Sequence, residues 1–327
     1  MGASAAAAVL WLSLAGAAPQ AREIEALLDA PELVDVSVIL LGLDSVDRMT
    51  VPVSVAGSVT YPFVVDTGSE RTVVSTELAR ALRLREGPDV RVLSMAGQST
   101  APSVHIPTLA VSGVSRSGLV APAFAGRHLG AAGLIGLDAL QGKRVLLDFD
   151  RGEMRVEPAS VREERWDGDT IVIRARSRYG QLVLADATMN GERVHVILDT
   201  GSQVSVGNLA LRRRLARRGS VPVELTSVTG ESLQAESAPL STITIGTAEI
   251  ANLPVAFTDA APFHRFGLAD RPAMLLGMDA LRLFRRVSVD FAARRVRLEA
   301  RDHIGRPAQM FTARTGMLSR IASASRD

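Results

Sequence analysis

The stretch FVVDTGSERTVVS, residues 63–75, places one aspartate between an apolar run and a Thr-Gly-Ser turn. A carboxylate that directly follows a buried strand costs free energy unless hydrogen bonds or chemistry make use of it. The same pattern returns as ILDTGSQVSVGN at residues 197–208, so that Asp66 and Asp199 occupy matching positions 133 residues apart. The repetition indicates that the two aspartates share one role.

Three further matches follow the two aspartates in the same order. SMAGQS (94–99) matches SVTGES (227–232), again 133 residues apart. GLIGLDAL (133–140) matches MLLGMDAL (274–281), and LLDFD (146–150) matches SVDFA (288–292), at separations of 141 and 142. Collinear matches of this kind indicate a duplicated domain. The change in separation places an insertion of about eight residues in the later copy, between its second and third markers.

Each copy has the pattern of a β-rich domain. Alternating apolar and polar residues surround a turn at Gly57 and Ser58 in the first copy and at Asn190 and Gly191 in the second, which predicts a hairpin before each aspartate. One short helix is expected after each motif, with Ser75 or Thr76 as the first N-cap and Asn208 as the second. The sequence therefore predicts a mostly β fold with two homologous lobes.

The composition excludes several classes of function. The 37 Lys and Arg residues nearly balance 35 Asp and Glu residues, so no nucleic-acid partner is expected. The chain has no cysteine, no H-E-x-x-H motif and no G-x-S-x-G motif. Thiolate chemistry, a zinc hydrolase and a serine hydrolase therefore lack support, and neither a metal nor a cofactor is expected. The arginine-rich run at residues 211–219 is interpreted as the solvated face of a helix.

Six segments are expected along the chain. The apolar run Ala5–Leu14 and the small residues after it predict a signal peptide or N-terminal anchor, and hence a protein exported to the periplasm or anchored in the membrane facing it. The segments are the signal or anchor (1–21), an N-terminal extension (22–47), a first lobe (48–157), a linker (158–168), a second lobe (169–300) and a polar C-terminal tail (301–327).

Two homologous lobes that pack about an approximate two-fold axis would bring Asp66 and Asp199 together. Two carboxyl groups at that distance share one proton, which provides a base and an acid at one pH. The ionised partner activates a water molecule, and the protonated partner donates to the carbonyl under attack. In the alternative interpretation each aspartate only forms a turn.

The residues next to the aspartates suit this chemistry. Gly68 and Gly201 leave room for backbone N–H groups to approach the carboxylates. Thr67 and Thr200 carry hydroxyls that are expected to bond across the axis, because buried hydroxyls need partners. Ser69 and Ser202 are expected to donate to the outer carboxylate oxygens, which favours the ionised form and an acidic to near-neutral pH optimum.

These motifs resemble the aspartic proteases of the pepsin and retropepsin superfamily, in particular bacterial single-chain proteins with two retropepsin-like domains. The resemblance covers about residues 50 to 300 and implies two β-barrel lobes related by a pseudo-two-fold axis, with the active site between them. It also implies that the apolar-apolar-Gly elements ending at Gly136 and Gly277 support the catalytic loops. Met95, Gly97, Val228 and Gly230 are then flap residues, although neither flap contains the tyrosine typical of pepsins.

Two other pairs of acidic residues repeat and are kept out of the catalytic set. Asp138 and Asp279 are expected to cap a short helix in each copy. Asp148 and Asp290 are expected at strand ends or turns. Both pairs are therefore interpreted as structural.

The sequence as a whole predicts an aspartic endopeptidase that binds an extended polypeptide substrate. A monomer should be sufficient for activity, because one chain carries both aspartates. Two alternatives remain: a peptide-binding module that keeps the fold without turnover, and a structural domain of an envelope assembly in which the aspartates only form turns.

Overall fold

The computed structural model describes residues 37–40, 42–43, 49–111, 114–140, 142–162, 166, 170–184, 187–215, 219–301 and 309–312. Within these residues the fold is mostly β, as the sequence predicts. The expected signal peptide or anchor lies outside the described residues, as do most of the N-terminal extension and most of the C-terminal tail. None of the helices in the described part of the chain has the length and apolar character that a membrane crossing requires.

The first lobe is a closed six-stranded β-barrel. Its ladder runs β3-β4-β11-β5-β10-β9 and closes where β9 returns to pair with β3. Ser54 makes the closure possible, because it pairs with Thr60 on one side and with Ala110 on the other. The elements of this lobe are β2 (Gly42–Leu43), β3 (Met49–Val55), β4 (Thr60–Val65), β5 (Val73–Ser75), α2 (Thr76–Ala81), β6 (Arg85–Glu86), β7 (Val90–Leu93), β8 (Gln98–Ala101), β9 (Ser103–Val111), β10 (Val114–Phe124), α3 (Gly126–Leu129), β11 (Gly133–Ile135) and α4 (Leu137–Leu140).

The second lobe repeats this arrangement but its barrel is not closed, which corrects the expectation of two barrels. The strand that would close it is divided into two elements. Strand β15 pairs with β18 and with β14 of the shared sheet, whereas β16 pairs with β21 and β17. Its elements are β15 (Gln181–Leu184), β16 (Ala187–Met189), β17 (Glu192–Arg193), β18 (His195–Leu198), β19 (Ser205–Gly207), α5 (Leu209–Arg212), β20 (Val221–Thr226), β21 (Ser232–Ile245), β22 (Ala248–Phe257), α6 (Ala261–Arg265), β23 (Ala273–Leu276), α7 (Met278–Leu281) and β26 (Gln309–Thr312).

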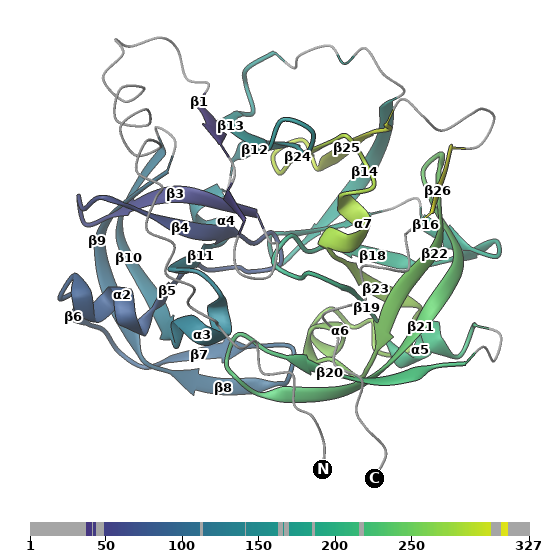
Figure 1. The fold of residues 1–327 in the computed structure, drawn as a ribbon, viewed down its shortest axis with the longest axis horizontal. Helices are drawn as coiled ribbons and strands as arrows, with labels where there is room; N and C mark the ends of the chain where they lie inside the picture. Colours follow the sequence, from purple (N-terminus) through teal and green to yellow (C-terminus); the bar gives the residue numbers. More distant parts are fainter. Residues whose placement is uncertain are drawn as a thin grey trace, which may run out of the picture.

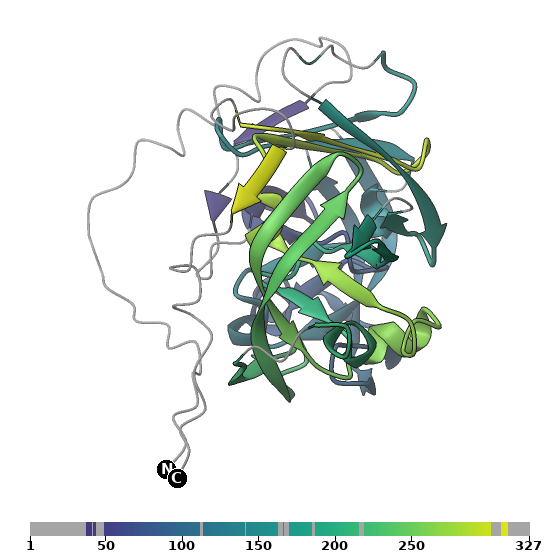
Figure 2. The same ribbon diagram turned by 90° about the vertical axis from the view of Figure 1, so that its right-hand side faces the viewer.

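A six-stranded sheet joins the two lobes and lies across the top of the molecule in Figure 1. Figure 2 shows the same sheet from the side, above the second lobe. Its order is β1-β13-β12-β24-β25-β14. The strands are β1 (Ser37–Leu40), β12 (Lys143–Asp148), β13 (Glu153–Pro158), β14 (Thr170–Arg178), β24 (Arg286–Asp290) and β25 (Arg295–Glu299).

The register at the centre of this sheet locates the pseudo-two-fold axis. Strand β12 pairs antiparallel with β24, and Leu146 lies opposite Ser288. These two residues are also counterparts in the duplicated sequence. A residue that faces its own counterpart lies on a two-fold axis. The axis therefore passes between the two lobes at the middle of the shared sheet.

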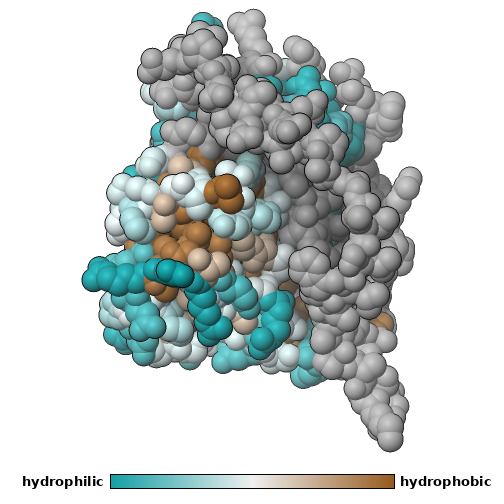
Figure 3. All heavy atoms as spheres, turned by 60° about the vertical axis from the view of Figure 1, so that its left-hand side comes forward, coloured by the Kyte–Doolittle hydropathy of each residue, from teal (hydrophilic) through white to brown (hydrophobic). Residues whose placement is uncertain are grey.

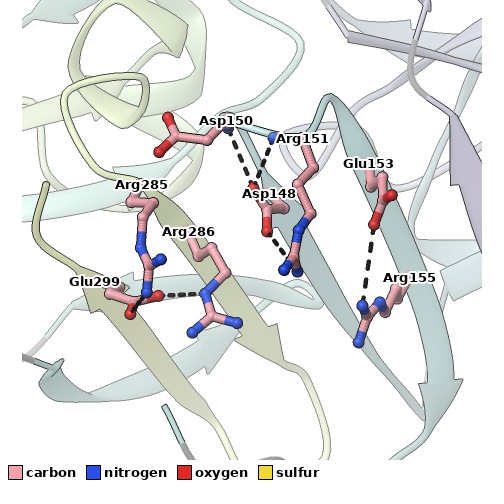
Figure 4. A network of polar contacts seen from close by, with 8 residues as sticks. All are labelled: Asp148, Asp150, Arg151, Glu153, Arg155, Arg285, Arg286 and Glu299. Atoms are coloured by element: carbon pink, nitrogen blue, oxygen red, sulfur yellow. Dashed lines mark hydrogen bonds and ion pairs between the residues drawn. The ribbon is translucent and has the colours of Figure 1, made fainter. Parts of the chain in front are cut away.

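Charged side chains form hydrogen bonds and ion pairs on the shared sheet, as Figure 4 shows. Glu299 is fully buried and accepts hydrogen bonds from Arg285 and Arg286. Burial alone would raise the pKa of Glu299, but the bonds from the two arginines hold it below its ordinary value. On the neighbouring hairpin, Asp148 accepts the N–H groups of Asp150 and Arg151 at 3.1 and 3.0 Å, which is the turn role predicted for it.

The largest hydrophobic cluster contains residues of both lobes, including Phe63, Leu147, Phe284 and Val289, each at most 1% exposed. On the face of the molecule that Figure 3 presents, apolar atoms form a limited area bordered by hydrophilic side chains. Burial of apolar side chains inside and between the lobes is therefore the main source of stability.

Local signals in the sequence correspond to the observed turns and caps. The side chain of Ser75 accepts the N–H of Leu78 at the start of α2, and the side chain of Asn208 accepts the N–H of Leu211 at the start of α5. Asn190 and Gly191 both have positive φ in the turn between β16 and β17. The predicted caps and this turn are confirmed.

The insertion predicted in the later copy lies in the connection that contains α6. Residues 258–272 link β22 to β23, whereas only residues 125–132 link β10 to β11 in the first lobe. Both connections contain one short helix, α6 and α3. The lobes therefore differ in length at the connections that contain α3 and α6 (Figure 1).

The two apolar-apolar-Gly elements pass between strands on either side of each aspartate motif. Strand β11 pairs with both β4 and β5, and β23 pairs with both β18 and β19. A Cβ atom added at Gly136 would lie 2.5 Å from the carbonyl oxygen of Arg71, and one added at Gly277 would lie 2.6 Å from that of Val204. Both glycines are therefore required by the close approach of a neighbouring backbone.

We expect the substitution Gly277→Ala to lower the free energy of unfolding by about 3 kcal/mol, because the new methyl group meets backbone atoms that cannot move aside freely. The matched control is Gly219→Ala, where an added Cβ atom would have no neighbour within 4 Å. Chemical denaturation of both variants measures the difference. Equal stability of the two variants would contradict this account of the threading strand.

Candidate active site

The two aspartate loops meet at the axis through their threonines. The N–H of Thr67 donates to Oγ1 of Thr200 at 3.0 Å, and the N–H of Thr200 donates to Oγ1 of Thr67 at 3.2 Å. The hydroxyls in turn donate to main-chain carbonyls of the opposite lobe, Thr67 to Leu198 at 3.1 Å and Thr200 to Val65 at 2.7 Å. Both threonines are at most 3% exposed. Four reciprocal hydrogen bonds in a buried site therefore fix one loop against the other.

The glycines bring the two carboxyl groups together. Gly68 donates its N–H to Oδ1 of its own Asp66 at 2.8 Å, and a Cβ atom added at Gly68 would lie 2.7 Å from Oδ1 of Asp199. Gly201 repeats the arrangement: its N–H donates to Asp199 at 3.0 Å, and an added Cβ atom would lie 2.5 Å from Oδ1 of Asp66. Each glycine thus contacts both carboxyl groups. Any side chain at either position would separate them.

The two serines have a different role from the one predicted. The hydroxyl of Ser69 donates to the carbonyl of Arg71 at 2.7 Å, and that of Ser202 donates to the carbonyl of Val204 at 2.8 Å. A hydroxyl carries one proton, so these bonds use it, and the prediction that it bonds an outer carboxylate oxygen is wrong. The main chain of Ser202 does contact the aspartate, because its N–H donates to Oδ1 of Asp199 at 3.1 Å.

The predicted flap residues lie at the tips of two hairpins, at the bottom of Figure 1. The first flap hairpin consists of β7, β8 and the turn at 94–97, which contains Met95 and Gly97. The second consists of β20, the start of β21 and the turn at 227–231, which contains Val228 and Gly230. The two hairpins occupy equivalent places in the two lobes.

The tip of each flap hairpin contacts the opposite lobe. Met95 packs against an apolar cluster of the second lobe that includes Phe263, and its carbonyl accepts the N–H of Ala261 at 3.1 Å. Val228 packs against a cluster of the first lobe that includes Leu129. The two tips also meet, because the hydroxyl of Ser94 lies 3.4 Å from Oε2 of Glu231. The hairpins therefore cross in a closed arrangement.

Three contacts beside the first aspartate motif could not be read from the duplication. Gln181 donates to the carbonyl of Gly68. Arg265 of α6 forms an ion pair with Glu70. The guanidinium of Arg265 also lies 4.2 Å from the ring centre of Tyr179. The position that corresponds to Gln181 in the first copy is Arg48, and Arg265 lies in the inserted segment. No repeated pattern marks either residue.

Asp138 and Asp279 are not the helix caps that the sequence predicts. The N-cap of α7 is Gly277, and Asp279 lies inside the helix. Its carboxylate accepts the N–H and the hydroxyl of Ser205 at 2.9 and 2.7 Å, while that of Asp138 accepts the N–H and the hydroxyl of Thr72 at 2.9 and 2.7 Å. Both therefore bind the chain just after an aspartate motif. The two aspartates repeat at a separation of 141 residues, the same as that of Gly136 and Gly277. This shared separation was the signal in the sequence for their role.

No group of three or more His, Asp or Glu side chains in the described ranges is placed to bind a metal ion. Asp290 accepts the N–H of Ala293 at 2.7 Å, the turn role predicted for it. Asp66 and Asp199 lie next to the bonded threonines, and the carboxyl group of each lies close to the glycine of the opposite motif.

The geometry agrees with the comparison with known families. The model of a family described as aspartyl protease matches the chain twice, at residues 51–139 and 185–280. The chain therefore belongs to the aspartyl protease family, with one retropepsin-like domain in each lobe. No curated protein matches the sequence closely enough to count as a relative.

We expect the substitution Thr200→Val to lower the free energy of unfolding by about 2–4 kcal/mol. It keeps the side-chain shape but leaves the buried N–H of Thr67 and the carbonyl of Val65 without their partner. The control Thr200→Ser keeps the hydroxyl and should cost less than about 1 kcal/mol. Thermal and denaturant unfolding measure both variants. If valine and serine at this position gave equally stable proteins, the crossing bonds would not join the lobes.

A pH dependence of stability follows from Asp279, because burial raises the pKa of its carboxyl to about 6, above the ordinary value of 3.8. The folded protein then binds this proton more tightly than the unfolded chain, so stability falls as pH rises from about 4 to about 6. The loss is roughly 3 kcal/mol. Asp279→Asn removes it, and unfolding curves at several pH values measure the difference between the two proteins. A difference that stays constant across this range would contradict the assignment.

Proposed function

We propose that the protein is an aspartic endopeptidase in which Asp66 and Asp199 together activate a water molecule. The observation that carries the proposal is the contact of each carboxyl group with the glycine of the opposite motif. Two carboxyl groups so close to each other cannot both ionise without a large cost, so the pair holds one proton between them. One of the pair then acts as a base and the other as an acid.

The proposed reaction needs no other group. The ionised carboxylate removes a proton from water as the water oxygen attacks the peptide carbonyl carbon, and the protonated carboxyl donates to the carbonyl oxygen. The bond from the tetrahedral diol to nitrogen then breaks, and the nitrogen receives the proton that the first carboxylate took. At the same time one diol hydroxyl returns a proton to the second carboxylate as the carbonyl of the acid product forms. The pair ends with one proton, as it began.

The flap hairpins support an extended peptide as the substrate. They close over the side of the aspartate loops that is opposite to the shared sheet, as Figure 1 shows. A peptide in extended form could bond along its backbone to such hairpins while its side chains alternate between the two lobes. Both aspartates come from one chain, so a monomer is sufficient for the proposed activity. We further propose that the protein acts after export, facing the periplasm, because of the apolar segment at residues 5–14.

The test is hydrolysis of a peptide library by the full chain, with the products identified by mass spectrometry. Asp66→Asn and Asp199→Asn should each lower kcat/KM by about 1,000-fold or more, because either change removes the acid–base pair. Both variants should remain folded, as judged by unfolding. Asp270→Asn changes an exposed carboxylate outside both motifs and both flap hairpins and is the matched control, with unchanged activity.

A statine-type peptide, whose hydroxyl-bearing carbon imitates the tetrahedral diol, should inhibit the reaction. Normal cleavage by either single aspartate variant would defeat the mechanism. Binding of peptides without any cleavage by the unmodified protein would instead favour a peptide-binding module that keeps the fold.

A further inference from the structure

Each aspartate loop is supported from behind by a short segment that follows the apolar-apolar-Gly element. In the second lobe the N–H of Met278 donates to the carbonyl of Ser202 at 2.9 Å, and the N–H of Asp279 donates to that of Gln203 at 3.0 Å. In the first lobe the corresponding bonds run from Leu137 to Ser69 at 2.9 Å and from Asp138 to Glu70 at 3.3 Å. These bonds reach the residues that directly follow the Asp-Thr-Gly turns.

In the second lobe the carboxylate of Asp279 extends this support to Ser205. Oδ2 accepts the N–H of Ser205 at 2.9 Å, and Oδ1 accepts its hydroxyl at 2.7 Å and the N–H of Ala280 at 2.8 Å. The hydroxyl of Ser205 also accepts the N–H of Gly277 at 3.1 Å. Asp279 is only 8% exposed. Water is therefore largely excluded as a replacement for any of these partners.

The supported segment is joined directly to the catalytic carboxylate. Ser202, whose carbonyl is bound by Met278, donates its own N–H to Oδ1 of Asp199 at 3.1 Å. A displacement of residues 202–205 would therefore move one of the hydrogen-bond donors of Asp199. Displacements of about 1 Å at a reacting group are enough to lower a rate strongly.

We propose that Asp279 is a positioning residue for the second catalytic loop: both of its carboxylate oxygens, acting as acceptors, hold Ser205 and thereby the donor geometry around Asp199. The inference deepens the proposed endopeptidase function and rests on it. Asp138 provides the same support in the first lobe with one oxygen, because the N–H and the hydroxyl of Thr72 both donate to Oδ1. Asp138 is also half-buried, so its other oxygen is less enclosed than those of Asp279.

This difference between the lobes provides a matched pair of variants. An asparagine has one acceptor oxygen and one NH₂ group. At position 138 the single oxygen can still accept both donors of Thr72. At position 279 the NH₂ group would face either the N–H or the hydroxyl of Ser205, so one buried donor would lose its acceptor. The same chemical change should therefore disturb only the second loop.

The experiment compares the full-length Asp279→Asn and Asp138→Asn variants at pH 7 with a cleaved peptide from the library. Asp279→Asn should lower kcat about 10-fold or more with KM changed less than about 3-fold, while Asp138→Asn should stay within about 3-fold of the unmodified protein in both constants. A role in stability alone would lower the unfolding temperature without this selective loss of kcat. Equal kcat for the two variants, or a change confined to KM, would overturn the proposal.

Hydrogen exchange of the segment 199–207 is a readout that does not need activity. Exchange there should rise in Asp279→Asn and not in Asp138→Asn, and unchanged exchange in both variants would overturn the proposal. If the unmodified protein cleaves no peptide, the proposed function fails, and exchange still decides whether Asp279 positions the loop.

A second pair of variants covers the case in which Asp279→Asn does not fold. Ser205→Ala removes the hydroxyl that links Gly277 to Asp279, and it should show the same loss of kcat and the same rise in exchange. Ser205→Thr keeps a hydroxyl at this position, and the counterpart residue in the first lobe, Thr72, is itself a threonine. This variant should retain the kcat and the slow exchange of the unmodified protein. Equal behaviour of Ser205→Ala and Ser205→Thr would count against the proposal.

Discussion

The reciprocal hydrogen bonds between Thr67 and Thr200 are the interaction on which the rest of the structure depends. The hydroxyl oxygen of each threonine accepts the main-chain N–H of the other, and each hydroxyl donates to a carbonyl of the opposite lobe. These carbonyls belong to Leu198 and Val65, the residues that directly precede the aspartates. Because these groups are buried, neither loop can move without leaving polar atoms unpaired. The position of each carboxyl group relative to the other is therefore set by the main chain.

The shared sheet and the two flap hairpins lie on opposite sides of this junction. On one side the shared sheet, whose central strands pair about the axis at Leu146 and Ser288, fixes the relative orientation of the lobes. On the other side two crossed hairpins contact the opposite lobe through Met95 and Val228. In the function proposed above, these hairpins are the part that opens to admit a peptide, because small apolar contacts separate more easily than a sheet.

The sequence predicted the parts of this structure that occur twice. The duplication located both aspartate motifs, the repeated segments around Gly97 and Gly230, the two apolar-apolar-Gly elements and the insertion. The roles of these repeated segments as flaps and as supports of the loops came from the family resemblance. The repeat also included Asp138 and Asp279, but the rule for helix caps assigned them the wrong role. Their actual partners, Thr72 and Ser205, are distant in sequence, so a local rule could not identify them. The open second barrel, Gln181 and Arg265 lie where the copies differ, and no repeat could reveal them.

A crystal structure of the full chain with a bound statine-type peptide would show directly whether the two aspartates act as a pair. We expect the hydroxyl of the inhibitor to lie within hydrogen-bond distance of carboxyl oxygens from both Asp66 and Asp199, with the peptide extended beneath the two flap hairpins. An inhibitor hydroxyl that contacts one aspartate alone, or a peptide bound away from the axis, would contradict this expectation.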